Sequence, residues 1–149
     1  MEIERKFLLK NDSWKKIASK SIHIKQGYIS TNPLSVVRIR IADSKSFLTI
    51  KGKGSNISRP EYEYEIPLQD AEEMYNLFCQ HTGLAKTRHI VEYKGHIWEI
   101  DEFEGRHQGL ILAEVEMKSE DEEVILPEWI EKEVTGDPRY YNSNLAKAD

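Results

Sequence analysis

Charged residues recur at every second position along much of this chain, and that spacing places them together on one face of a β-strand. A mixed row, Glu2/Glu4/Lys6, opens the chain, and most later rows carry one sign of charge. The basic rows are Arg38/Arg40, Lys51/Lys53 and Lys86/Arg88, and the acidic rows are Glu61/Glu63/Glu65, Glu99/Asp101 and Glu114/Glu116. Because like charges in a row repel one another, each kind of row needs a compensating partner.

An anion rich in oxygen would compensate the basic rows, since arginine offers a planar fork that matches phosphate and lysine a compact point charge. A hard divalent cation would compensate the acidic rows, because Mg²⁺ and Mn²⁺ take carboxylate and water oxygens and bridge to phosphates. Together the rows predict a site for a divalent metal and a polyphosphate. The plainer interpretation is that each row faces water, as one face of an antiparallel strand usually does.

The elements that must position these rows follow from the period of the sequence. Residues alternate between apolar and polar over eight stretches, which we interpret as strands: 2–9, 21–30, 35–42, 46–53, 59–66, 84–94, 96–103 and 109–118. Turn-forming residues separate most of these stretches, which favours hairpins and hence an antiparallel sheet.

One helix is expected between the fifth and sixth strands. Asp70 would cap this helix and Gly83 would stop it. Its apolar face would carry Ala71, Met74, Tyr75 and Phe78. A shorter helix is expected after Asp12 and Ser13, and irregular or helical turns from Pro127 onward.

An open sheet of eight strands would leave two edges with unpaired backbone groups, and closure into a barrel removes them. We therefore expect an α+β fold: a closed eight-stranded antiparallel β-barrel, or tunnel, with a few peripheral helices. The length of 149 residues fits a single domain spanning 1–149.

Composition narrows the class of protein further. The net charge of −5 argues against nonspecific binding to nucleic acid or to an anionic membrane. No apolar run approaches the ~20 residues that span a bilayer, and the chain is charged from Glu2 onward, so neither a membrane span nor an export signal is expected. Cys79 is the single cysteine and has no internal partner, which is compatible with a cytoplasmic protein.

Other kinds of site are disfavoured by spacing. The five histidines show no i, i+4 pair and no Cys/His pattern, which argues against zinc. The segment Gly52-Lys53-Gly54-Ser55 lacks the spacing of a phosphate-binding loop and is typical of a turn. Cys79 lies beside the apolar face of the expected helix and is interpreted as an inert buried thiol.

The opening residues Glu2-Ile3-Glu4-Arg5-Lys6 match the pattern ExExK, and further charged motifs follow in order. These are Arg38-Ile39-Arg40, Leu48 to Gly52, Arg59 to Glu63, Lys86-Thr87-Arg88, Trp98 to Asp101, Ala113 to Glu116, Glu133 to Thr135 and Tyr140 to Leu145. In this order the motifs resemble the CYTH, or triphosphate tunnel metalloenzyme, superfamily, over essentially the whole chain. His89 departs from the family, in which many relatives have an aromatic residue on this outward-facing row.

The resemblance implies an eight-stranded tunnel that binds a triphosphate-bearing small molecule together with Mg²⁺ or Mn²⁺. It implies that phosphates are held by the basic residues Lys6, Arg38, Arg40, Lys51, Lys53, Arg59, Lys86 and Arg88. It implies metal ligands first in Glu2, Glu4, Glu114 and Glu116, and next in Glu61 and Glu63. Glu65, Glu99 and Asp101 are left open between metal ligands and groups that neutralise the basic rows.

Phosphoryl transfer depends on positioning and charge stabilisation more than on a protein nucleophile. Lys6 and Lys51 are therefore counted as catalytic as well as substrate-binding. Tyr28, in the second expected strand, is a candidate for orienting the attacking water if a lysine such as Lys51 lies close to it. Packing at the mouth of the tunnel is the alternative role for Tyr28.

Members of the superfamily include inorganic, thiamine and RNA triphosphatases and one class of adenylate cyclases, and the fold does not choose among them. We interpret the chain as an inorganic triphosphatase that cleaves tripolyphosphate to phosphate and diphosphate, because no inserted loop is evident that would recognise an organic group. An adenylate cyclase, a thiamine or nucleotide triphosphatase, and a noncatalytic sensor of polyphosphate or nucleotide are the alternatives. A monomer and a homodimer are both compatible with the sequence.

Overall fold

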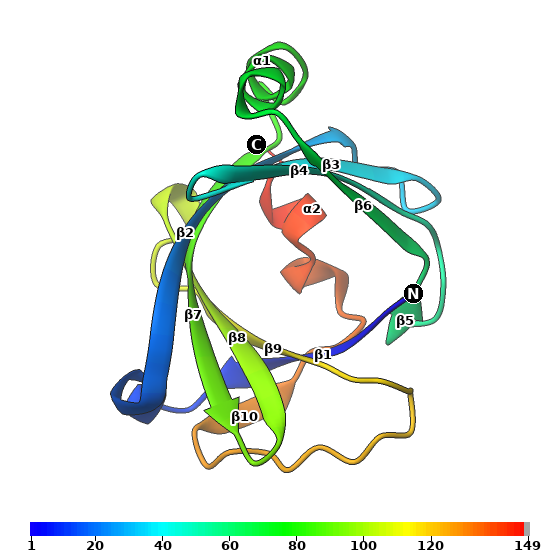
Figure 1. The fold of residues 1–149 in the computed structure, drawn as a ribbon. Helices are drawn as coiled ribbons and strands as arrows, with labels where there is room; N and C mark the ends of the chain where they lie inside the picture. Colours follow the sequence, from blue (N-terminus) through cyan, green and yellow to red (C-terminus); the bar gives the residue numbers. More distant parts are fainter. Residues whose placement is uncertain (148–149) are drawn as a thin grey trace.

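Ten β-strands form one curved antiparallel sheet in the computed structural model, which describes residues 1–147 (Figure 1). The strands are β1 (Glu2–Leu9), β2 (Ala18–Ser30), β3 (Val36–Ala42), β4 (Lys45–Lys51), β5 (Ser58–Arg59), β6 (Glu61–Ile66), β7 (Gly83–Tyr93), β8 (His96–Phe103), β9 (Ile111–Glu116) and β10 (Ile130–Glu133). Hydrogen-bonded neighbours follow the order β10-β1-β9-β8-β7-β2-β3-β4-β6, and β5 pairs with β1. The expected α+β class with a mainly antiparallel sheet is confirmed.

Helices are short and few in the described part of the chain. The α-helices are α1 (Leu68–Phe78) and α2 (Asn142–Leu145), and the 3₁₀ turns are η1 (Ser13–Ile17), η2 (Gly105–His107) and η3 (Pro138–Tyr140). The short helix expected after Ser13 is η1. None of the helices within residues 1–147 is long and apolar enough to cross a membrane.

A barrel closed by hydrogen bonds is not confirmed. The path of the sheet ends at β6 on one side and at β10 on the other, and within residues 1–147 no strand ladder joins β6 to β1. The two-residue strand β5 narrows the gap, because Arg59 pairs with Glu2, and the Glu4 N–H donates to the Ile57 carbonyl at 2.9 Å. Closure is incomplete because the expected strand 59–66 breaks at Pro60, which has no N–H to donate, and its two parts pair with different neighbours.

Several predicted boundaries need correction. The strand expected over 46–53 ends at Lys51, so Lys53 lies in the following loop rather than on the same strand face. Strand β10 was not predicted, because four residues are too few to show a period. The bounds of β1 and β8 agree with the predicted 2–9 and 96–103.

The ends of α1 also differ from the prediction. The residue at the N-cap is Pro67, and Asp70 lies inside the first turn. The helix ends at Phe78, so Gly83 does not stop it but begins β7. Ala71 is fully buried, whereas Phe78 is 55% exposed, so the apolar face is narrower than expected.

Cys79, just after α1, is buried as predicted. It packs against β2 at Gly27, where an added Cβ would lie 2.5 Å from the Cys79 Cβ. Glycine at this position therefore allows α1 to lie close against the sheet. In Figure 1, α1 lies on the outside of the curved sheet, over β3, β4 and β6.

The sheet is inverted relative to a typical soluble sheet, with charged rows inside and apolar rows outside. One outer cluster joins Phe7, Trp98 and Val115 of the strands to Trp14 and Trp129 from covering segments. A second outer cluster joins Ile39 of β3 to Ala71 and Cys79. The interpretation that every charged row faces bulk water is therefore wrong, although Glu63, Glu65 and Glu116 are exposed.

His89 lies on the outer face, as its position in the sequence predicts. Its ring packs on Trp14 with 4.9 Å between centroids. The departure at His89 therefore leaves the charged interior unchanged.

A third apolar cluster fills one end of the interior. Four of its strand residues lie two positions from a charged row and so share its face: Val36, Leu84, Phe103 and Leu112. Tyr28 joins them from β2, where it is opposite Arg38 in the β2–β3 ladder. Leu145 and Ala146, at the end of α2, complete this cluster. Figure 1 shows α2 within the ring of strands, so the C-terminal segment closes this end.

Candidate active site

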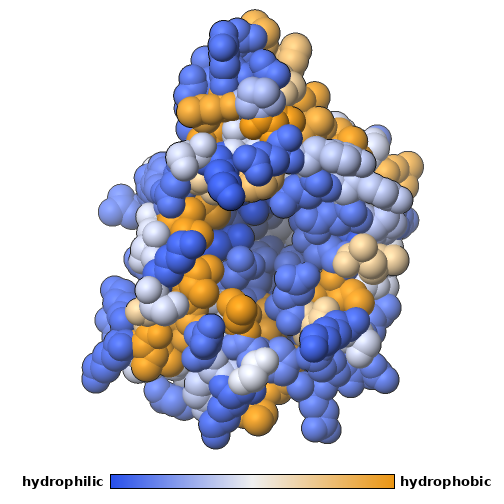
Figure 2. Space-filling view, in the orientation of Figure 1, coloured by the Kyte–Doolittle hydropathy of each residue, from blue (hydrophilic) through white to orange (hydrophobic). Residues whose placement is uncertain are grey.

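The inward-facing rows surround a cavity of about 670 Å³. Figure 2 shows a hollow in the middle of one face of the molecule, bordered mainly by hydrophilic residues. Among the described residues, eight basic side chains line the cavity: Lys6, Arg38, Arg40, Lys51, Lys53, Arg59, Lys86 and Arg88. Seven acidic side chains line it as well: Glu2, Glu4, Glu61, Glu63, Glu99, Glu114 and Glu116.

The structure therefore brings together every residue of the predicted site. Tyr28 lines the same cavity. Of the three acidic residues left open by the sequence, Glu99 lines the cavity, whereas Asp101 and Glu65 do not. The shared cavity defines the site, and the individual roles of the residues that line it remain predictions.

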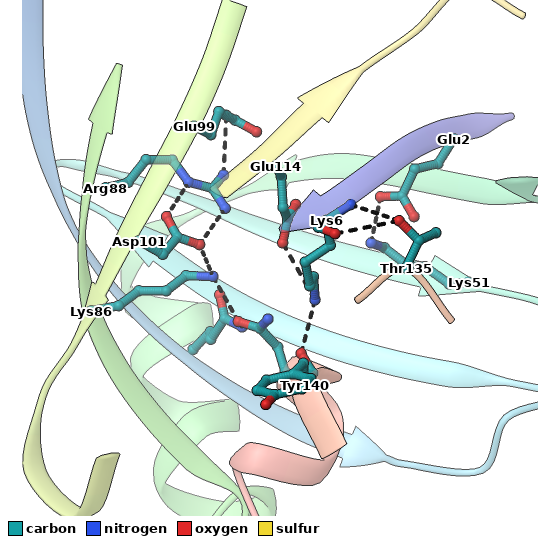
Figure 3. Close-up of polar contacts among 12 residues, drawn as sticks. Glu2, Lys6, Lys51, Lys86, Arg88, Glu99, Asp101, Glu114, Thr135 and Tyr140 are labelled. Carbon is teal, nitrogen blue, oxygen red and sulfur yellow. Dashed lines mark hydrogen bonds and ion pairs between the residues drawn. The ribbon is translucent and has the colours of Figure 1, made fainter. Parts of the chain in front are cut away.

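Strands β1 and β9 place acidic and basic groups opposite one another. Lys6 is opposite Glu114 in the ladder, and its Nζ lies 3.5 Å from the carboxylate and donates to the Tyr140 carbonyl at 2.9 Å (Figure 3). Burial alone would raise the pKa of Glu114, but Lys6 and Arg88 lower it to about 2. Lys6 is thus held between a carboxylate and the C-terminal segment.

A second ion-pair group joins β1, β4 and β5. Glu2 accepts from Lys51 at 2.6 Å and from Arg59 at 3.1 Å. Although burial would raise the pKa of Glu2, these two cations lower it to about 2. Lys51 is therefore paired with a carboxylate.

Tyr28 accepts a hydrogen bond from Gln26 at 3.1 Å. Within the described residues no hydrogen bond joins Tyr28 to Lys51, so the predicted proximity of these two groups receives no support from the hydrogen bonding. Tyr28 also packs against Val36 and Leu84, which fits the alternative packing role.

Strands β7 and β8 build the most deeply buried charges of the site. Arg88 donates to both carboxylate oxygens of Asp101, at 2.8 and 3.0 Å, and to Glu99 at 3.2 Å. Lys86 Nζ lies 2.8 Å from Asp101 (Figure 3). Burial would raise the pKa of Asp101, but Arg88 and Lys86 lower it, so Asp101 is a buried neutraliser behind the basic row.

Lys86 behaves differently from Arg88. Burial lowers the pKa of Lys86 to about 7, and the neighbouring Arg88 and Arg40 add to this effect while Asp101 opposes it. For Arg88, Asp101 and Glu99 outweigh burial, and the pKa is raised well above its ordinary value. Lys86 thus has a pKa near neutral pH and lies beside arginines that carry their charge at that pH.

Arg38 and Arg40 lie on β3 and differ in their partners. Arg38 donates to Thr49 at 3.2 Å and to Glu63 at 3.3 Å. Arg40 has no carboxylate within 4.0 Å among residues 1–147, and its Nε donates to the neutral Gln26 Oε1 at 3.0 Å. Burial, Arg38 and Arg88 lower the pKa of Arg40 to about 9, so this cation lacks a counter-ion.

The acidic side chains of the cavity offer carboxylate oxygens, the donors that a hard divalent cation takes. Glu4 and Glu116 lie directly opposite each other in the β1–β9 ladder, where like charges repel. Burial, Glu114 and Glu2 raise the pKa of Glu4 well above its ordinary value. Among the residues described, no three His, Cys, Asp or Glu side chains form a preassembled metal site, and the metal ligands stay a prediction.

Sequence reasoning missed the neutral residues of the site. Gln26 is fully buried and shares the inward face of β2 with Tyr28, so a polar residue at an inward position was the available signal. Asn142 accepts from Lys86 at 2.7 Å. It lies within the motif Tyr140 to Leu145, but that segment has no strand period and no role was predicted for Asn142.

A charged cavity enclosed by a curved antiparallel sheet is the arrangement that the ordered charged motifs of the sequence predict. The CYTH domain matches residues 1–141, and the chain belongs to this family. It is 44% identical over 146 residues to the inorganic triphosphatase of Acetivibrio thermocellus, covering 98% of this chain and 93% of that protein. It is 36% identical to the inorganic triphosphatase of Nitrosomonas europaea, covering 97% of this chain and 96% of that protein.

Solved structures agree with this assignment. The crystal structure of an inorganic triphosphatase superposes with a TM-score of 0.69 at 32% identity, covering 98% of this chain and 94% of that one. A Hippeastrum protein, proposed to be an adenylyl cyclase and described with a dominant triphosphatase activity, superposes with a TM-score of 0.63 at 20% identity, covering 80% of each chain. That second likeness shows a shared fold alone.

Proposed function

We propose that the protein is an inorganic triphosphatase, which hydrolyses tripolyphosphate to phosphate and diphosphate with Mg²⁺ or Mn²⁺. The observation that carries this proposal is the cavity in which eight basic and seven acidic side chains of the described residues meet. Two relatives named inorganic triphosphatase, similar over nearly the whole chain, support it.

The basic residues bind the phosphates of the substrate. Inside the sheet the effective dielectric is lower than in bulk water, so each charge–charge attraction is stronger there. Arg40 is available to an anion without breaking an ion pair, whereas Lys6, Lys51 and Arg59 exchange a carboxylate for a phosphate. Lys53, in the exposed loop after β4, meets the substrate at the mouth of the cavity.

The acidic residues at the β1–β9 side hold the metal. Glu4 and Glu116 are its first ligands, and Glu2, Glu61, Glu63 and Glu114 complete the candidate set. A bound divalent cation supplies neutralisation of phosphate charge and orders water near the phosphorus.

In the proposed reaction the oxygen of a water molecule forms a bond to a terminal phosphorus, the bond from that phosphorus to the bridging oxygen breaks, and diphosphate leaves. One proton of the water stays on the phosphate formed, and the other passes to the leaving diphosphate, directly or through solvent. Lys6 and Lys51 stabilise charge on the phosphate oxygens, and the Tyr28 hydroxyl orients the water. No covalent enzyme intermediate is needed.

The closed end of the interior favours an inorganic substrate. Its apolar cluster is filled by Leu145 and Ala146 of the chain itself, which leaves no free apolar pocket there for a purine or a thiamine ring. Adenylate cyclase and organic triphosphatase activities are therefore second to inorganic triphosphatase. We infer that the chain acts as a single cytoplasmic domain, as a monomer or homodimer, with a tunnel that encloses the substrate.

The test is phosphate release from tripolyphosphate, ATP, thiamine triphosphate and diphosphate, each with Mg²⁺ or Mn²⁺, with cyclic AMP followed in the ATP sample. We expect the wild type to release phosphate from tripolyphosphate much faster than from the other substrates, and we expect Lys6→Ala to abolish this activity. Cyclic AMP as the main product would replace the proposal with a cyclase. Tight binding of polyphosphate without turnover of any substrate would replace it with a sensor.

A further inference from the structure

Gln26 connects two cations of the cavity through neutral groups only. Its Oε1 accepts from Arg40 Nε at 3.0 Å, and its Nε2 donates to Asn142 Oδ1 at 3.2 Å and to Tyr28 Oη at 3.1 Å. Asn142 Oδ1 in turn accepts from Lys86 Nζ at 2.7 Å. The side chain of Gln26 is fully buried, and each of its polar atoms has a partner.

The orientation of both amides is fixed by the two ends of this chain of hydrogen bonds. Lysine and arginine only donate hydrogen bonds, so Lys86 requires an oxygen from Asn142 and Arg40 requires an oxygen from Gln26. The Gln26 NH₂ group must then face Asn142 and Tyr28. A flipped amide would set donor against donor at Arg40, so the Gln26 oxygen is held on the Arg40 Nε.

Arg40 is left as a cation that is oriented but not neutralised. Within residues 1–147 its two terminal nitrogens have no hydrogen-bond partner, and Arg40 lines the cavity. By contrast, Arg38, Lys86 and Arg88 each lie within 4.0 Å of a carboxylate. A guanidinium fixed through Nε presents its other nitrogens as a fork, the arrangement that binds phosphate in a bidentate manner.

We propose that Gln26 is a positioning residue that fixes the guanidinium of Arg40 for phosphate binding while leaving its charge free for the substrate. A carboxylate at this position would orient Arg40 equally well, but it would also supply the counter-ion that the phosphate must provide. The neutral amide therefore separates orientation from neutralisation. The inference rests on the proposed function, because it names the group that receives a phosphate of the polyphosphate substrate.

The decisive variant is Gln26→Glu, which keeps the size of the side chain and an acceptor for Arg40. The measurements are the dissociation constant of tripolyphosphate without metal, KM and kcat with Mg²⁺, and the Tm of the ligand-free protein. We expect the dissociation constant and KM to rise by about tenfold or more. The ligand-free Tm should change little, because the new ion pair with Arg40 offsets the loss of the hydrogen bond that Gln26 donates to Asn142. Gln108→Glu makes the same change of charge on an exposed turn and should leave binding and Tm as in the wild type.

A second variant, Gln26→Met, keeps the neutral charge and removes the hydrogen bonds. It should lower Tm more than Gln26→Glu, because Arg40, Asn142 and Tyr28 lose a partner, yet impair tripolyphosphate binding less. The proposal thus predicts that Gln26→Met loses more stability whereas Gln26→Glu loses more affinity. A purely structural role of Gln26 would not give these opposite rankings. Wild-type affinity in Gln26→Glu, or losses of affinity that follow losses of Tm in both variants, would overturn it.

Failure of the wild type to bind or hydrolyse tripolyphosphate would have a different meaning, since it would overturn the proposed function and this inference with it. The wild-type measurements therefore precede those on the variants.

Discussion

The basic side chains of the cavity are not equivalent, because their partners differ. Arg88 is held by Asp101 and Glu99, which raise its pKa well above the ordinary value. Lys86 is fully buried, and burial lowers its pKa to about 7 despite its contact with Asp101. An anion that binds nearby raises the pKa of a lysine. Because the pKa of Lys86 is near 7 before the substrate binds, we expect Lys86 to gain protons when the substrate binds at physiological pH.

Metal-free binding of tripolyphosphate should weaken as the pH rises above about 7. Below this pH Lys86 carries its proton in the free protein, whereas above it the anion must draw a proton onto Lys86, so affinity falls by up to about tenfold per pH unit. The measurement is calorimetric titration from about pH 6 to 9 in the wild type and in Lys86→Met. The variant removes the contribution of Lys86 but retains the titration of the ligand, so parallel curves for the two proteins would contradict this assignment.

Tyr28→Phe tests the role of the hydroxyl that faces the cavity. If this hydroxyl orients the attacking water, kcat should fall by about tenfold or more between neutral and alkaline pH. The ligand-free Tm should change little, because Gln26 keeps its hydrogen bond to Asn142. Wild-type turnover throughout this pH range would leave Tyr28 with only its packing against Val36 and Leu84.

Sequence identified the charged residues of the site because sign and spacing carry their signal. Lys6, Arg40 and Glu114 belong to rows of period two, and all three line one cavity. The pairing of each charge could not be predicted, since it depends on strand register and on contacts across the interior. Gln26 and Asn142 were missed for the same reason, because a neutral amide gains its role only from the cations it joins.

At the scale of elements, strand β1 carries two kinds of chemistry within two residues. Glu4 faces Glu116 of β9, and Lys6 faces Glu114 of the same strand. Because side chains at i and i+2 share a face, the proposed metal ligand Glu4 and the proposed phosphate ligand Lys6 are neighbours on the inner face of β1. The β1–β9 ladder thus sets the distance between the proposed metal and phosphate sites.

Variants on this ladder should fail in different ways. Lys6→Ala should weaken binding of tripolyphosphate by about tenfold or more even without metal, because a phosphate ligand is lost. Glu116→Ala should leave metal-free binding at least as tight and raise the Mg²⁺ concentration that gives half-maximal turnover. Calorimetry without metal and metal titrations of activity separate these effects, and identical defects in both variants would contradict separate roles.

The strands were predictable where the alternation is long and a turn closes a hairpin, as in β1 and β8. The break at Pro60 was not resolved from the sequence, because the charged period continues across it from Arg59 to Glu61. The start of α1 was misplaced since Asp70 resembles a cap, although the helix begins directly after Pro67. Tertiary contacts decide such ends, and a local pattern does not contain them.

The whole molecule places its charges inside and its apolar rows outside, under α1, η1 and the segment around Trp129. Stability therefore comes mainly from the outer clusters, whereas the interior holds partly compensated charges that are costly to bury. Of the described cavity residues, eight are basic and seven acidic, so the ligand-free site is close to neutral but locally divided by sign. In the proposed function, the phosphates of the substrate compensate the basic residues and the metal compensates the acidic residues.

Ligand binding should therefore stabilise the folded molecule strongly. Tripolyphosphate without metal, which the proposed metal-dependent reaction does not consume, adds about 2.7 kcal/mol to the free energy of unfolding at about 100 times its Kd. For a domain of 149 residues this corresponds to a rise in Tm of roughly 5 to 11 °C. Thermal unfolding with sulfate at equal ionic strength is the control for general salt effects, and Lys6→Ala is the control for the site. A rise no greater than that with sulfate would mean that the charged interior binds no polyphosphate, because any ligand that binds only the folded state must raise Tm.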